Sequence, residues 1–313
     1  MAPPVPIPPD VRAWLLGVFG SCNERVASIV TEVPTTHETP LDMTFVQHFL
    51  GVSAPHHFES GWTVDLSTHY LGGGRHWSEW PDWPLRRWEI ADIGLLVLFR
   101  QRGKLMRSKV ALLQSKRLYP DELDWDEDSP LDYAVGFARL YRSDEDWGQV
   151  MAPRQFTFTS QSRYKALVSG VGQYKAIANY EEQRKIPVYY LLYNPLDVPT
   201  TTTIPITPGR PPTAAPCNVG CRVIPAAHLR AVLNGQPDGS SPAYGELTAS
   251  LTEPFDVAVH RAGWRLEHFV VNLLLECETG YIAAGPNDNG LNYVFNRRSG
   301  PISAALAVTL DAP

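Results

Sequence analysis

Apolar positions recur along the chain with two different periods, which predict its helices and strands. In residues 11–31 the apolar side chains follow helical spacing, which predicts one helix or two with weak points at Gly17 and Gly20. A second helix is expected over residues 40–50, because Thr39 is a good N-cap and a proline suits the first helical position.

Strands are predicted where apolar residues alternate with polar ones or form short uninterrupted runs. Residues 61–70 alternate, whereas 89–99 and 186–195 are almost continuously apolar, as buried strands are. Residues 109–120 form another apolar run with a polar end, and the turn before it predicts a hairpin. A helix interrupted by glycines is expected over 163–185. The order is thus helix, three strands, helix and strand, an α/β arrangement.

Composition divides the chain into four segments. Residues 1–35 are a proline-rich arm with a helix, and 36–196 carry the predicted α/β core. Residues 197–216 are rich in threonine and proline, so we expect a loop or linker without regular structure. Residues 217–313 are expected to pack on the core as a C-terminal extension.

The overall composition is that of a folded protein in a reducing compartment. Hydrophobic residues are 44% and charged residues 19% of 313, enough apolar material for a core. Four scattered cysteines are too few for a disulfide framework. The first residues lack the basic region and the long apolar region that we expect of a signal peptide. The apolar runs have the length of a strand and are too short for a membrane-spanning helix. We therefore expect a cytoplasmic protein without a membrane partner.

The net charge of −6 argues against a histone-like nucleic-acid binder. Its distribution is uneven, because residues 121–146 hold ten acidic and only two basic residues. Residues 75–117, in contrast, hold ten Lys or Arg against four Asp or Glu. The acidity thus comes largely from one segment, which either is a solvated loop or shields a basic groove.

Polar residues at specific points of the predicted core indicate a catalytic site. Asp92 lies in an apolar strand, where a carboxylate is costly unless a cation neutralises it. Gln114 and Lys116 are two residues apart and so face the same side of the next strand. Magnesium prefers oxygen ligands such as carboxylates, and a lysine can stabilise the charge that develops in phosphodiester hydrolysis. Glu38 starts the preceding helix, and Gln173 lies on the following one.

The pattern Asp92 … Gln114-Ser115-Lys116 resembles the D … (D/E/Q)-x-K signature of the restriction-endonuclease-like PD-(D/E)XK nucleases. The resemblance covers about residues 36–195, and the stretches IADIGLLV, LLQSKRLYP and IPVYYLLYN are similar to a bacterial family of such proteins. It implies an αβββαβ core with a central mixed sheet flanked by helices, plus C-terminal α/β additions. It also implies a Mg²⁺- or Mn²⁺-dependent endonuclease whose expected substrate is double-stranded DNA. The biological role that it implies is anti-phage defence.

The resemblance also assigns roles to residues. Glu38 matches an acid in the helix before the sheet, and Gln173 a polar residue on the helix after the motif strand. The implied metal ligands are Glu38, Asp92 and Gln114, and Lys116 is the implied catalytic lysine. Because Gln114 replaces an acid, Glu38 or Glu89 is needed as a further ligand.

Further contacts and rival functions are left open by the sequence. Arg117 and Tyr119 are expected to contact nucleic acid. Arg86 and Arg87 lie in a tryptophan-rich loop and are expected to do the same. The alternative for this loop is a small separate hydrophobic cluster. One alternative is a catalytically inactive nuclease fold that binds nucleic acid or a partner protein in a defence complex. A second alternative is an RNase. A homodimer is expected by resemblance.

Overall fold

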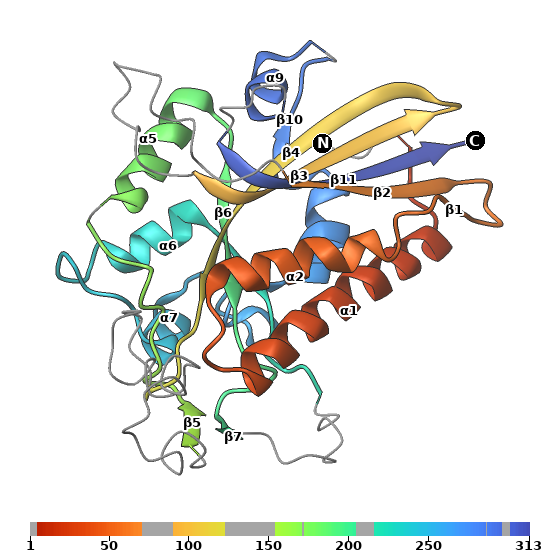
Figure 1. Ribbon diagram of the computed structural model, residues 1–313. Helices are drawn as coiled ribbons and strands as arrows, with labels where there is room; N and C mark the ends of the chain where they lie inside the picture. The colour runs from red at the N-terminus through yellow and green to blue at the C-terminus, as the bar shows by residue number, and fades with distance from the viewer. Residues whose placement is uncertain are drawn as a thin grey trace, which may run out of the picture.

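A large mixed β-sheet with helices on both sides organises the chain (Figure 1). The computed structural model describes residues 5–70, 90–122, 154–170, 172–204, 216–285, 287–295 and 301–313. All statements about structure concern these residues. The predicted α/β class, with a central mixed sheet flanked by helices, is confirmed.

The elements have the following bounds. The helices are α1 (Pro9–Glu32), α2 (Glu38–Leu50), α5 (Gln173–Arg184), α6 (Ala226–Leu233), α7 (Tyr244–Ser250), α8 (Leu266–His268) and α9 (Asn289–Phe295), together with the 3₁₀ helix η3 (Ala258–His260) and the π-helix η4 (Phe269–Leu274). The strands are β1 (His56–His57), β2 (Thr63–Tyr70), β3 (Ala91–Gln101), β4 (Lys104–Arg117), β5 (Arg154–Phe158), β6 (Val188–Tyr193), β7 (Thr200–Ile204), β8 (Arg222–Pro225), β9 (Trp264–Arg265), β10 (Tyr281–Ile282) and β11 (Ile302–Ala312).

The sheet contains strands from both ends of the chain. Its order is β1-β2-β11-β3-β4-β6-β8-β9, and β10 pairs with β4 at one side. The last strand, β11, is antiparallel to β2 and parallel to β3, so it separates two strands that are consecutive in the predicted core. The C-terminal segment therefore does more than pack on the core, because its last strand lies inside the central sheet.

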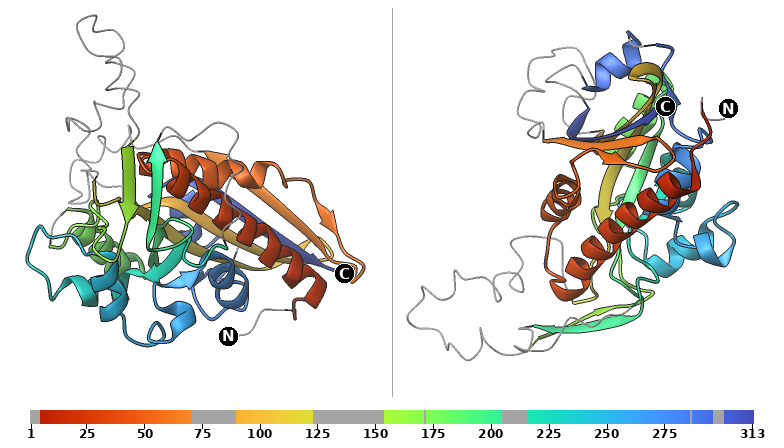
Figure 2. Two further views of the ribbon diagram at one scale, coloured as in Figure 1. Left: turned by 90° about the horizontal axis from the view of Figure 1, so that it is seen from below. Right: turned by 90° about the vertical axis from the view of Figure 1, so that its right-hand side faces the viewer.

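Two layers of helices cover the sheet. Helices α1 and α2 pack side by side on one face, and α5 and α6 lie on the other (Figures 1 and 2). The apolar side of α1 explains its position, since Val11, Leu15 and Phe19 are fully buried. The rings of Phe19 and Phe49 are 4.9 Å apart and join α1 to α2. This packing holds the end of α2 against α1.

The hairpin and the parallel crossover of the predicted core are present. Strands β3 and β4 are antiparallel and joined by a tight turn at residues 102–103, whereas β4 and β6 are parallel, with α5 between them in sequence. The elements α2, β2, β3, β4, α5 and β6 follow one another in the expected order. No described helix combines the length and apolar character needed to cross a membrane.

Three local predictions were wrong. Helix α2 begins at Glu38 with His37 as its N-cap, two residues before the expected Thr39 cap. The predicted interruption at the glycines is present, with positive φ angles of 72° at Gly170 and 48° at Gly172, but the part of 163–185 before them is not helical. The Thr/Pro-rich segment was expected to lack regular structure, yet Thr200–Ile204 forms β7 and pairs with β5, since threonine suits a strand.

Candidate functional site

Strands β3 and β4 bring Asp92 and Gln114 together at one end of the sheet. Because the strands are antiparallel, β3 begins beside the end of β4, with Ile93 opposite Leu113. The Oδ2 atom of Asp92 accepts hydrogen bonds from the Gln114 side-chain amide at 2.5 Å, the Ser115 backbone N–H at 2.7 Å and the Ser115 hydroxyl at 2.8 Å. Three donors of β4 therefore hold this carboxylate.

Glu38 joins the site from the first residue of α2. Its Oε1 atom accepts a hydrogen bond from the Arg117 backbone N–H at 3.1 Å. Its Oε2 atom lies 3.4 Å from the Nζ atom of Lys116, a side chain that is almost fully buried. The structure thus places Glu38 and Lys116, which are 78 residues apart in sequence, in one ion pair.

A further acid, Asp42, belongs to this cluster and was not predicted. It follows Glu38 by four residues, so both acids lie on the same side of α2. Its Oδ1 atom accepts a 2.7 Å hydrogen bond from the Tyr193 hydroxyl of β6, and its Oδ2 atom lies 3.0 Å from the Ser115 hydroxyl. The i, i+4 spacing was the sequence signal that could have identified Asp42.

Burial and mutual repulsion shift the pKa values of the acids. Burial raises the pKa of Asp92 to about 6, and the charge of Glu38 adds to the rise, although the Lys116 ammonium and the Ser115 hydrogen bonds oppose it. Burial and the neighbouring Asp92 hold the pKa of Asp42 well above its usual range. Burial alone would lower the pKa of Lys116, but the carboxylates of Glu38 and Asp92 outweigh it and raise that pKa. Lys116 therefore stays charged.

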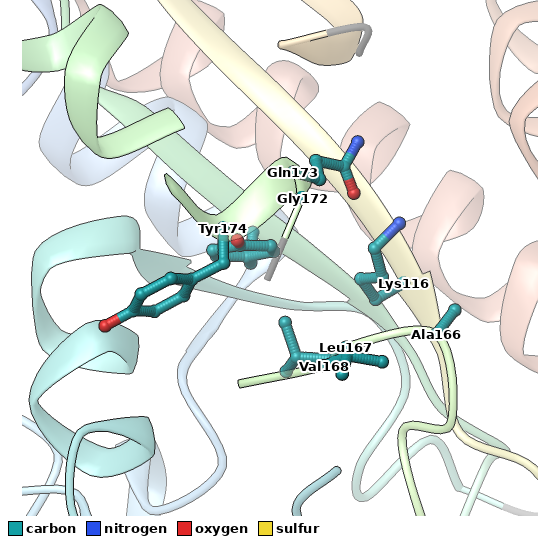
Figure 3. A pocket seen from close by; sticks show the side chains of 8 residues that line it. Lys116, Ala166, Leu167, Val168, Gly172, Gln173 and Tyr174 are labelled. Atoms are coloured by element: carbon teal, nitrogen blue, oxygen red, sulfur yellow. The ribbon is translucent and has the colours of Figure 1, made fainter. Parts of the chain in front are cut away.

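Two cavities adjoin the cluster. One of about 250 Å³ is lined by both Asp42 and Asp92. The other, of about 150 Å³, is lined by Lys116 together with Gln173, the first residue of α5. Figure 3 shows the side chains of Lys116 and Gln173 near each other at this second cavity. The structure therefore brings Gln173, as well as Glu38, Asp92 and Gln114, close to Lys116.

The side chains of the cluster fit a divalent cation. Within the described ranges, no group of three or more His, Cys, Asp or Glu residues has the arrangement of a metal site. Magnesium, however, needs only one or two carboxylates beside waters, and amide oxygens also serve. The Oε1 atom of Gln114 is buried and has no hydrogen-bond partner. An unpaired buried acceptor beside carboxylates with raised pKa values is the environment that a cation would stabilise.

Arg117 and Tyr119, which were predicted to contact nucleic acid, make contacts within the protein in this structure. Both side chains are buried, and the Arg117 guanidinium donates to the backbone carbonyl oxygen of Pro34 at 2.5 Å and lies 4.4 Å from the Tyr119 ring centroid. Arg117 therefore ties the segment before α2 to β4. Arg86, Arg87 and Glu89, the tryptophan-rich loop and most of the acidic segment 121–146 lie outside the described residues.

Comparison with known proteins adds no relative. No protein-family model, no curated protein and no solved structure matches this chain. Function is therefore inferred from the geometry and chemistry of the site, together with the resemblance of its sequence pattern.

Proposed function

We propose that the chain is a metal-dependent nuclease that hydrolyses phosphodiester bonds, with double-stranded DNA as its first candidate substrate. The observation that carries the proposal is the convergence of Glu38, Asp92, Gln114 and Lys116 at one end of the sheet. These residues come from a helix and two strands, and nothing in a purely structural role requires a buried lysine to face several acids. Perturbed titratable groups beside cavities are typical of active sites.

Each residue has a distinct chemical role in this proposal. Glu38 and Asp92 would hold the metal through carboxylate oxygens, and Gln114 through Oε1, the buried atom without a partner. When bound, Mg²⁺ or Mn²⁺ would polarise a phosphodiester oxygen. The charged Lys116 would stabilise the negative charge that develops on the phosphate, or orient the attacking water. Gln173 would position substrate or water beside Lys116.

The biological setting follows from the resemblance alone. Bacterial proteins with this motif pattern suggest a cytoplasmic effector that degrades phage or foreign DNA, acting as a homodimer or with a partner protein. The site itself contains no feature that distinguishes DNA from RNA. Both substrates therefore belong in the first experiment.

The test is cleavage of plasmid DNA and of RNA by the purified full chain with Mg²⁺ or Mn²⁺. We expect cutting that stops on addition of a chelator and that is abolished in Lys116→Ala and in Asp92→Ala. Lys104→Ala is the matched control, because Lys104 lies on the same strand but is exposed and at the opposite end. Cutting that survives both Lys116→Ala and Asp92→Ala would refute the site.

A second candidate function is a nucleic-acid-binding module without catalysis. The specific observation that favours it is Gln114, which stands where the resemblance expects an acid and which donates to Asp92 instead of repelling it. This candidate predicts no cleavage of either nucleic acid with any divalent cation. It predicts binding that weakens steeply as salt concentration rises.

A further inference from the structure

We propose that Asp42 supplies the acid that Gln114 lacks, so that Asp42 and Asp92 bind one divalent cation between them. This inference rests on the proposed nuclease function and adds a ligand that the motif pattern does not contain. It begins from position, because Asp42 lies on α2, one helical turn after Glu38, and faces the same end of the sheet.

The two aspartates are linked through one hydroxyl group. The Ser115 Oγ atom is 3.0 Å from Asp42 Oδ2 and 2.8 Å from Asp92 Oδ2. A hydroxyl carries a single proton and donates it to one acceptor at a time. Ser115 therefore cannot donate to both carboxylates at once, and one of the two needs a further partner, either a proton or a cation.

Both carboxylates also border the same empty space. The cavity of about 250 Å³ is lined by Asp42 and Asp92, and none of its described lining residues is basic. A volume of this size holds a hydrated cation, since a water molecule occupies about 30 Å³. Lys116, whose charge acts on both aspartates, lines the other cavity and not this one.

An independent observation points to a ligand at this cluster. Gln114 is only 2% exposed, its amide group lies against Asp92, and its Oε1 atom has no hydrogen-bond partner. Native structures rarely leave such an acceptor unpaired. The amide nitrogen of Gln114 lies 2.5 Å from Asp92, so the unpaired oxygen belongs to the same group of polar side chains, although Gln114 itself does not line the cavity.

The surroundings of Asp42 hold its side chain in place. The Tyr193 hydroxyl donates to Oδ1, which leaves Oδ2 on the side of Ser115 and Asp92. Tyr193 is fully buried on β6 and thus a rigid support. Tyr193 is therefore a positioning residue, and its loss should weaken cation binding less than the loss of Asp42 itself.

Cation binding to the full chain at pH 8 tests the proposal directly. Free Mn²⁺ is followed by electron paramagnetic resonance for the wild type, Asp42→Asn, Asp92→Asn, Tyr193→Phe and the control Asp65→Asn, which removes an aspartate from strand β2. Because the acidic residues 121–146 also attract Mn²⁺, the site is defined as the binding that Asp92→Asn removes. Circular dichroism verifies folding, and Asp42→Ser replaces Asp42→Asn if that variant does not fold.

We expect Asp42→Asn to weaken Mn²⁺ binding by at least about tenfold, because even changes to residues that only support a ligand cost roughly 10–100-fold in metal affinity. Tyr193→Phe, which removes only a supporting hydrogen bond, should weaken it by about tenfold and by less than Asp42→Asn does, and Asp65→Asn should bind as the wild type does. Wild-type affinity in Asp42→Asn, with binding lost in Asp92→Asn, would overturn the role of Asp42 and leave the proposed function intact. Equal binding by the wild type and Asp92→Asn would instead overturn the proposed function.

Discussion

Replacing Asp92 with asparagine should make the cation-free protein more stable, by an amount that grows with pH. The folded protein raises the pKa of Asp92 from 3.8 to about 6, mainly because burial disfavours the carboxylate. Each pKa unit corresponds to about 1.4 kcal/mol, so ionised Asp92 costs the folded state about 3 kcal/mol. An asparagine at this position is never charged, so the variant escapes this cost and keeps a side chain of nearly the same shape.

The sign follows from proton binding. Between pH 3.8 and about 6 the folded state holds a proton that the unfolded state has lost, so stability falls as pH rises through this window. Below pH 3.8 wild-type Asp92 is protonated in both states, and any difference from the variant reflects hydrogen bonds alone. By linkage, about 1 kcal/mol of the effect lies between pH 5 and pH 8.

Thermal or urea unfolding at pH 5 and pH 8, in the presence of a chelator, measures the effect. The advantage of Asp92→Asn over the wild type should be about 1 kcal/mol larger at pH 8, roughly 2 °C in Tm. Asp65→Asn controls for the loss of an aspartate from the sheet. Added Mg²⁺ should then stabilise the wild type but not Asp92→Asn. An Asp92→Asn advantage that is the same at both pH values, or larger at pH 5, would refute the assignment of Asp92 as a destabilised carboxylate.

Two other buried cations give further predictions. Arg117→Ala should lower the free energy of unfolding by about 3 kcal/mol and reduce cleavage, because it frees the segment that positions Glu38. An unchanged urea midpoint would contradict the predicted loss of stability. Burial lowers the pKa of Lys109 to about 8, so the wild type should gain about 3 kcal/mol relative to Lys109→Met as pH rises from 8 to 10.5, when the unfolded state binds more protons. Equal urea midpoints for the two proteins at both pH values would show that the pKa of Lys109 is not lowered.

The sequence predicted those elements whose local pattern is strong. Strand β6 and the later part of β4 are buried on both faces, and β3 is buried on one face and half-buried on the other, so their apolar runs are nearly continuous, unlike those of a loop. The position of β11 could not be predicted in the same way. Its pattern shows only that it is apolar, whereas its pairing with β2 and β3 depends on contacts between residues more than 200 positions apart.

The candidate site was predicted where spacing within one strand was enough. Gln114 and Lys116 are two residues apart in one strand and therefore face the same side of the sheet. The negative charge of Asp92 in an apolar strand requires a neutralising partner. Asp42 was overlooked because its significance depends on Tyr193 and Ser115, which lie far away in sequence. The burial of Arg117 could not be predicted, because a strand-end arginine looks exposed in sequence, although its guanidinium is buried against Pro34.

The presence of glutamine at position 114 is consistent with an acid at position 42. Glu38, Asp42 and Asp92 already place three carboxylates near a single ammonium group, that of Lys116. A fourth carboxylate at 114 would lie beside Asp92 without a proton donor, and buried like charges at hydrogen-bond distance destabilise each other strongly. Glutamine avoids this repulsion, because its amide nitrogen donates to Asp92 while its oxygen remains a neutral ligand. In our proposal the second acid has therefore moved from the strand to the helix, and the site still offers a cation two aspartates.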